Sequence, residues 1–160
     1  MLGAACGNAP EQAGRVRALV ARPPKDTIRF EAPARAQRCS GGTVRGGLLL
    51  QGSSEGNGVV VWLRATAADS LAGGTWPLLQ RGDTVSPRGA TVGVRYLFHE
   101  VAHGLSLDSG SIEVRETTHA LTVVARGTGL ETMAAGRVAL EASFDAVPLE
   151  TDTVSCRPRL

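Results

Sequence analysis

Residues 137–146 have the sequence RVALEASFDA, in which every second side chain is apolar. A period of two is the side-chain repeat of a β-strand that has one face in a core and the other toward water. The stretch therefore predicts a half-buried strand near the C-terminus. The side chains expected to point inward are Val138, Leu140, Ala142, Phe144 and Ala146.

Further short apolar runs precede this strand and are separated by turn-forming residues. Residues 43–50 and 59–63 are predicted strands, joined by the Gly- and Ser-rich loop 52–58. Residues 105–114 predict a hairpin around the turn sequence DSGS, and residues 121–125 predict another strand. Seven or eight short strands with regular turns predict an all-β chain that folds as an antiparallel β-sandwich or barrel.

Residues 1–38 lack this pattern, apart from a short edge strand predicted over residues 27–30. They are interpreted as the remnant of an export signal followed by an extended tether over residues 7–38, with the β-sandwich domain expected over 39–160. The sequence LGAAC at 2–6 resembles the lipobox of bacterial lipoproteins, which predicts lipidation of Cys6. Only five residues precede Cys6, too few for the charged and apolar regions of a signal peptide. Either the true start lies upstream, or the resemblance is accidental.

Two of the three cysteines flank the predicted strands, Cys39 before the first strong strand and Cys156 after the last. A disulfide between them would close a loop of more than a hundred residues and constrain the unfolded chain by about 4–5 kcal/mol. Such a bond persists in an oxidising compartment, which predicts an exported protein at a periplasmic or outer-surface location. The alternative is two unrelated buried thiols.

The composition excludes several classes of protein. With 42% hydrophobic and 20% charged residues, the chain has enough apolar side chains for a core and is not a disordered tail. The net charge of +2 provides no field that would favour nucleic acid. No apolar run approaches the roughly 20 residues that span a bilayer, so contact with a membrane is expected only through a lipid at Cys6.

Three short motifs carry a resemblance to a known type of protein: Gly74–Pro77 (GTWP), Asp108–Gly110 (DSG) and the late strand that contains Phe144. Over residues 40–156 the chain resembles uncharacterised small secreted lipoproteins of bacteria that carry a β-sandwich domain. The resemblance implies the fold and an envelope location. It carries no catalytic residues.

The sequence HEVAH at 99–103 matches the zinc-peptidase motif H-E-x-x-H. On a helix, His99 and His103 would share a face and bind one Zn²⁺, while Glu100 would act as the general base on the metal-bound water. Apolar residues at helical spacing over 94–105 allow this helix, and Gly104 would end it. A third metal ligand would have to come from Asp108, Glu113, Glu116, His119 or Glu131.

Residues 92–98 also alternate as a strand does, through Val92, Val94, Tyr96 and Phe98. In that alternative the segment is a strand that leads into a loop, and both histidines face solvent. This alternative is favoured, because Gly93 is unfavourable near a helix start and no second helix is available to supply a third ligand.

Together these observations predict a non-enzymatic, exported β-sandwich without a cofactor, which binds an envelope protein or a small ligand. Its binding loops are expected at one end of the sandwich, around residues 52–58, 80–89 and 127–136, because binding residues concentrate on loops held by a rigid scaffold. The main alternative is a small zinc metallopeptidase that uses the HEVAH residues. A third is a structural envelope subunit that assembles through an edge strand.

Overall fold

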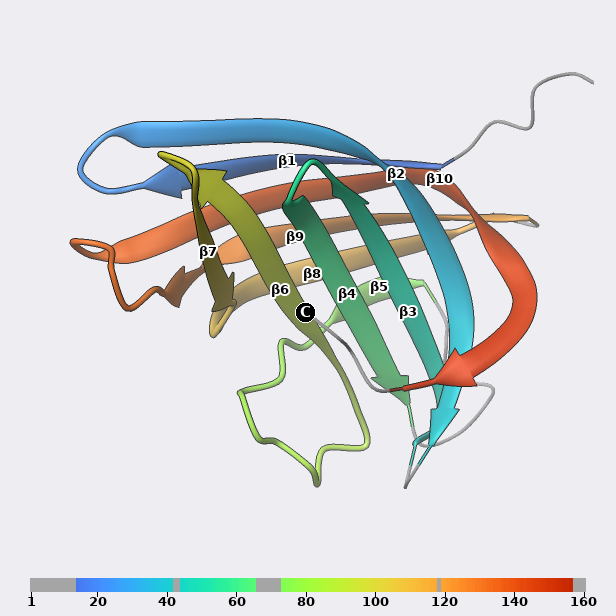
Figure 1. The fold of residues 1–160 in the computed structure, drawn as a ribbon. Helices are drawn as coiled ribbons and strands as arrows, with labels where there is room; N and C mark the ends of the chain where they lie inside the picture. The colour runs from blue at the N-terminus through green and yellow to red at the C-terminus, as the bar shows by residue number, and fades with distance from the viewer. Residues whose placement is uncertain (1–13, 42–43, 66–72, 118, 157–160) are drawn as a thin grey trace, which may run out of the picture.

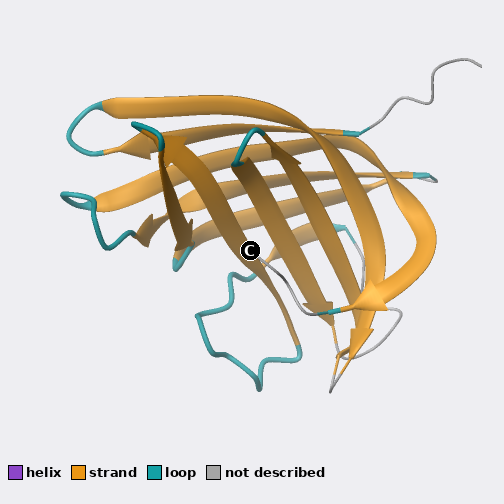
Figure 2. Ribbon diagram, viewed as in Figure 1, coloured by secondary structure: helices purple, strands orange, loops and turns teal. Residues whose placement is uncertain are grey.

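The computed structural model describes residues 14–41, 44–65, 73–117 and 119–156, and in these ranges the chain is all β, without a helix (Figure 2). None of the described residues belongs to a helix long and apolar enough to cross a membrane. The strands in chain order are β1 (Arg15–Arg22), β2 (Asp26–Gly41), β3 (Val44–Ser54), β4 (Asn57–Ala65), β5 (Gly74–Trp76), β6 (Arg88–Phe98), β7 (Val101–Ser106), β8 (Ser109–Glu116), β9 (Ala120–Leu130) and β10 (Arg137–Ser155).

The strands form one sheet in the order β5-β8-β9-β10-β1-β2-β3-β4-β6-β7. Neighbours in this order are antiparallel, and the end of β10 also pairs with β2 in parallel. The long strands β2 and β10 curve strongly, so that the two halves of the sheet face each other (Figure 1). The all-β, antiparallel fold predicted from the sequence is therefore confirmed. The described ranges contain ten strands, of which β2 has 16 residues and β10 has 19.

The core lies between the two facing halves and is built by alternate residues of each strand. In β10, Val138, Leu140, Ala142 and Phe144 are buried, as the alternation predicts. The prediction is wrong for Ala146, which is exposed and has a left-handed φ of 46°. A bulge between Phe144 and Val147 shifts the register there, so Val147 takes the next core position.

The prediction of a tether over residues 7–38 is wrong from Arg15 onward. Residues 15–22 form β1 in the middle of the sheet, and Val16 and Val20 are fully buried. The predicted domain boundary at residue 39 falls inside β2. The described prolines of this segment do not prevent strand formation: Pro23 and Pro24 lie in the turn between β1 and β2, and Pro33 lies within β2. Residues 7–13, Cys6 and Thr43 lie outside the described residues.

The structure contains the predicted disulfide between Cys39 and Cys156, whose Cα atoms are 4.9 Å apart. The bond joins β2 to the residue that follows β10, across a sequence separation of 117 residues. Cys39 packs with Leu49 and Val60 in a small second apolar cluster, outside the main core. The disulfide thus fixes the parallel pairing of the two long strands at their C-terminal ends.

Candidate functional site

The HEVAH segment forms the turn of the β6–β7 hairpin and the first residues of β7. His99 and Glu100 form the two-residue turn between β6 and β7, with left-handed φ values of 48° and 65°, and both are exposed. Two consecutive left-handed residues are the backbone of the tight turn that matches the twist of a hairpin. The helix over residues 94–105 that the zinc-peptidase alternative requires is therefore contradicted, because these residues belong to strands β6 and β7 and the turn between them.

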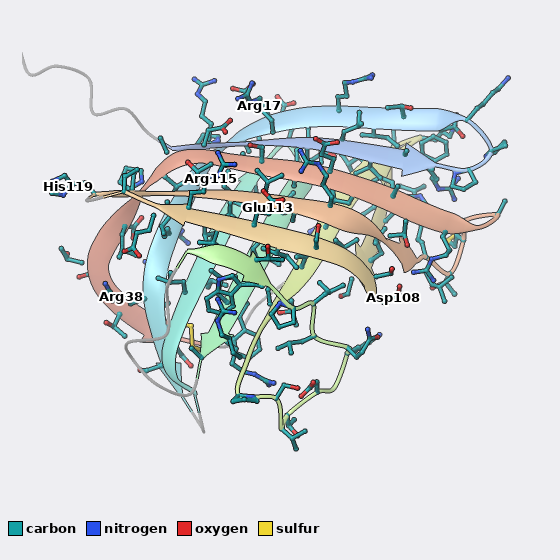
Figure 3. All side chains as sticks on the ribbon, turned by 180° about the vertical axis from the view of Figure 1, so that it is seen from behind. Arg17, Arg38, Asp108, Glu113, Arg115 and His119 are labelled. Carbon is teal, nitrogen blue, oxygen red and sulfur yellow. A yellow bond between two sulfur atoms is a disulfide. The ribbon has the colours of Figure 1, made fainter. Side chains whose placement is uncertain are left out.

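The other proposed metal ligands do not gather around these residues. Figure 3 places Asp108 and His119 at opposite ends of β8, and Glu113 lies on the exposed face of that strand. Of these candidate ligands, Glu131 is the one that contacts a motif histidine within the described ranges, by a hydrogen bond with His103. Among the residues that the structure describes, no group of three His, Cys, Asp or Glu side chains could hold a metal ion.

His103 instead belongs to a buried polar cluster, which corrects the expectation that it faces solvent. Its Nδ1 lies 2.5 Å from Glu131 Oε1, and the side chains of His103 and Glu131 are only 7% and 4% exposed. Tyr96 Oη donates a hydrogen bond to Glu131 Oε2, and Arg22 Nε approaches the same oxygen at 3.4 Å. We call Arg22, Tyr96, His103 and Glu131 the buried cluster.

The buried cluster joins elements that are distant in sequence. Tyr96 and His103 are paired across the β6–β7 hairpin, Arg22 ends β1, and Glu131 follows β9. The Arg22 guanidinium also donates to the carbonyl oxygen of Met133 at 2.6 Å and lies 4.7 Å above the ring of Phe98. The cluster therefore ties the last hairpin of one sheet half to the strand ends of the other.

The protonation states follow from burial and hydrogen bonding. Burial raises the pKa of Glu131, but the hydrogen bonds from Tyr96, His103 and Arg22 outweigh it and hold that pKa below its ordinary value. Burial, and then the hydrogen bond to Glu131, raise the pKa of Tyr96. Glu131 is thus an ionised acceptor that fixes its three donors.

A groove of about 870 Å³ lies against this cluster, along β7. Two of its charged side chains, Arg81 and Arg95, are exposed and form no ion pair in the described ranges, while Asp108 is paired with Arg137. The groove is positively charged for this reason. Its lining residues are Gln80, Arg81, Val94, Arg95, Ala102, His103, Gly104, Leu105, Ser106, Leu107, Asp108, Leu130 and Thr132.

A second buried arginine positions the loop that carries Arg81. Arg64 Nη1 donates to the Asp83 carbonyl oxygen at 2.7 Å, and Nη2 donates to the Ser86 carbonyl oxygen at 2.7 Å. The Ser86 hydroxyl and amide bind the Asp83 carboxylate and hold its pKa well below the ordinary value. Gln80 Nε2 donates to the carbonyl oxygen of Asp108 at 2.8 Å, which attaches the loop to the groove wall.

The three loops predicted to form one binding end come together only in part. Residues 80–81 and 130–132 reach the same groove, although Gly127–Leu130 belong to β9 rather than to a loop. Residues 52–58 form the end of β3, the β3–β4 turn and the start of β4, and they line a second hollow of about 590 Å³. Arg95 lines this hollow as well as the groove. In Figure 1 this turn and the 80–87 loop lie at opposite ends of β4, so the prediction of one shared end is wrong.

Sequence reasoning missed Arg22, Tyr96 and Arg95 as parts of this site and considered Glu131 only as a metal ligand. The hydrogen-bonded partners in the buried cluster are separated by 28 to 109 residues in the sequence, so no local sequence pattern indicates these contacts. Comparisons with protein-family profiles, curated proteins and solved structures found no match. The function therefore has to be inferred from the groove and the cluster themselves.

Proposed function

We propose that this protein is an exported, disulfide-stabilised binding module that holds an anionic ligand in the groove along β7, without catalysis. The observation that carries the proposal is the pair of arginines, Arg81 and Arg95, that both line this groove and form no ion pair with a carboxylate in the described structure. Arginine is well suited to carboxylate and phosphate ligands because its planar guanidinium can form two parallel hydrogen bonds.

The base of the groove supports binding rather than catalysis. His103 is held by Glu131 and stacks on Tyr96 with ring centroids 5.6 Å apart. A nucleophilic mechanism needs a hydroxyl or thiol within hydrogen-bond reach of the base. Within the described residues no such group is hydrogen-bonded to His103, which instead gives the groove a rigid base.

Export is supported by the Cys39–Cys156 disulfide, because such bonds persist in oxidising compartments. We extend the proposal to a periplasmic or outer-surface location with a lipid anchor at Cys6, as in the small bacterial lipoproteins that the chain resembles. The extension is tested by fractionation of cells that express the protein and its Cys6→Ser variant. Release of the variant from the membrane supports an anchor, and unchanged distribution contradicts it.

Ligand binding is tested by ¹⁵N-NMR titration with succinate, inorganic phosphate, an acidic peptide and a basic peptide. We expect shifts at residues 80–81, 94–95, 102–108 and 130–132 for at least one anionic probe, and loss of the shifts in Arg81→Glu/Arg95→Glu. The matched control is Arg38→Glu/Arg115→Glu, which changes two exposed arginines outside the groove (Figure 3). No shifts with any anion, or equal shifts in the groove variant, would contradict the proposal.

A further inference from the structure

The outer edge of β7 presents unused backbone hydrogen-bonding groups. β7 is the last strand of its sheet half, and among the described residues it pairs with β6 alone (Figure 1). The register places Tyr96 opposite His103 and Arg95 opposite Gly104. Residues next to a two-residue turn form a hydrogen-bonded pair, and the pairs then alternate along an antiparallel ladder. The hydrogen bond from the Leu107 amide to the Val92 carbonyl agrees with this alternation, because it makes Val92 and Leu107 a hydrogen-bonded pair. The amides and carbonyls of Ala102 and Gly104 therefore point away from β6.

This edge is closed at one end of β7 and open at the other. At the closed end the Ser106 carbonyl oxygen lies so near Gly129 that a Cβ added to Gly129 would be 2.3 Å from that oxygen. The Asp108 amide donates a hydrogen bond to the Thr128 carbonyl. At the open end Ala102 and Gly104 are exposed, and their edge-facing groups have no hydrogen-bond partner in the described part of the chain. One added strand could pair with them.

Gly104 is a glycine that the fold itself does not need. Its φ is not in the left-handed region, and an added Cβ would meet nothing closer than the Val94 carbonyl oxygen at 3.5 Å, an ordinary contact. Gly104 lies directly opposite Arg95 in the ladder. Since adjacent strands are only about 4.8 Å apart, the Arg95 side chain can extend across Gly104 to a strand beyond β7.

The charge and polarity of the side chains around the open edge indicate which kind of strand could pair with it. Arg95 and Arg81 supply positive charge to the groove, and Asp108 is already neutralised by Arg137. On the rim, Val101 is 51% exposed and Leu130 is 67% exposed, and both are apolar. A strand with acidic side chains on one face and apolar side chains on the other would complement both features.

We propose that β7 binds an extended acidic segment of a partner protein as an added β-strand, with its carboxylates on Arg95 and Arg81. This inference rests on the proposed function and names its ligand class. Main-chain hydrogen bonds to Ala102 and Gly104 provide the attachment, and charge selects the partner. A second copy of this chain fits less well, because pairing of two β7 edges would bring like-charged Arg95 side chains together.

The test uses three versions of the peptide acetyl-DVDVDV-amide titrated into the whole protein. One is unmodified, and the other two carry N-methyl groups on alternate amides, each blocking one edge of the peptide while preserving its charge. We expect one methylated peptide to lose at least tenfold in affinity and the other to stay within twofold. The Gly104→Val variant should bind the unmodified peptide at least tenfold more weakly, because the Val side chain blocks the path of the Arg95 side chain. Thermal unfolding of this variant checks that it is folded.

The failures of the two proposals are distinguishable. If both methylated peptides bind in the groove as well as the parent, the strand-addition inference is overturned and the anion-binding proposal survives. If no acidic peptide and no small anion binds there, both are overturned. Self-association that Gly104→Val removes, without peptide binding, would show that the edge pairs with a second copy and would overturn the acidic-segment inference.

Discussion

Removal of the Glu131 carboxylate should destabilise the fold more than any other single loss of charge in the buried cluster. Glu131 is the shared acceptor for Tyr96, His103 and Arg22, and its side chain is 4% exposed. In Glu131→Ala the Tyr96 hydroxyl and the His103 Nδ1 lose their acceptor in a buried site. Each orphaned group costs about 1–3 kcal/mol.

Arg22 adds less to this cost, because its contact with Glu131 is long, at 3.4 Å, and its guanidinium keeps the Met133 carbonyl. The total expected for Glu131→Ala is therefore about 3–5 kcal/mol, the range seen when one partner of a buried ionic pair is removed. Glu131→Gln keeps one acceptor oxygen, so its cost should be smaller, about 1–2 kcal/mol.

The assay is urea unfolding at pH 7, followed by tryptophan fluorescence, since Trp76 is 1% exposed and reports on the core. The matched control is Glu141→Ala, which breaks an exposed ion pair with Arg126 at 3.3 Å and should cost less than about 0.5 kcal/mol. A cost below about 1 kcal/mol for Glu131→Ala, or one equal to the control, would refute the account of the buried cluster.

Three further predictions concern stability. The pKa of Glu131 is lowered from its ordinary value of 4.5, so the ionised carboxylate stabilises the fold above that pH, and this stabilisation is lost as the pH falls through the folded-state pKa. The difference in unfolding free energy between wild type and Glu131→Gln should therefore narrow below about pH 4.5. A difference that stays constant with pH would argue against an ionised Glu131. Replacing Cys39 and Cys156 by Ser should lower the free energy of unfolding by about 4–5 kcal/mol, measured by urea unfolding against the oxidised wild type, whereas equal midpoints would contradict a bond that constrains the unfolded chain. Glu100→Gly should stabilise the protein by about 1 kcal/mol in thermal unfolding, because Glu100 has a φ of 65° that only glycine adopts without cost, and a loss of stability would contradict the turn geometry.

The fold could be predicted where the pattern is local. Alternation over residues 137–146 indicates a strand because neighbouring side chains alone determine which face is buried, and Leu140 and Phe144 lie in the core. Of the first half of β2, only a short edge strand over residues 27–30 was predicted, for the opposite reason. Most of its side chains from Asp26 to Glu31 are exposed or half-buried, and the strand is fixed by pairing with β1. Sequence pattern carries little information about such a strand.

The site could not be predicted, because contacts between distant residues decide it. Residues 94–105 have the helical period and residues 92–98 have the strand period, and pairing of β6 with β7 settles the ambiguity in favour of the hairpin. Once His103 is in that hairpin, its partner Glu131 comes from the chain after β9, and Arg22 comes from the end of β1. Neither residue has a neighbour in sequence that indicates this role.

The most direct test of the account is amide hydrogen exchange along β7 in the free protein. The open edge predicts fast exchange at Ala102 and Gly104 and slow exchange at His103 and Leu105, whose amides point toward β6. Addition of the acidic peptide should slow exchange at Ala102 and Gly104 selectively. Uniform protection of all four amides in the free protein would contradict an available edge, and with it the proposed mode of binding.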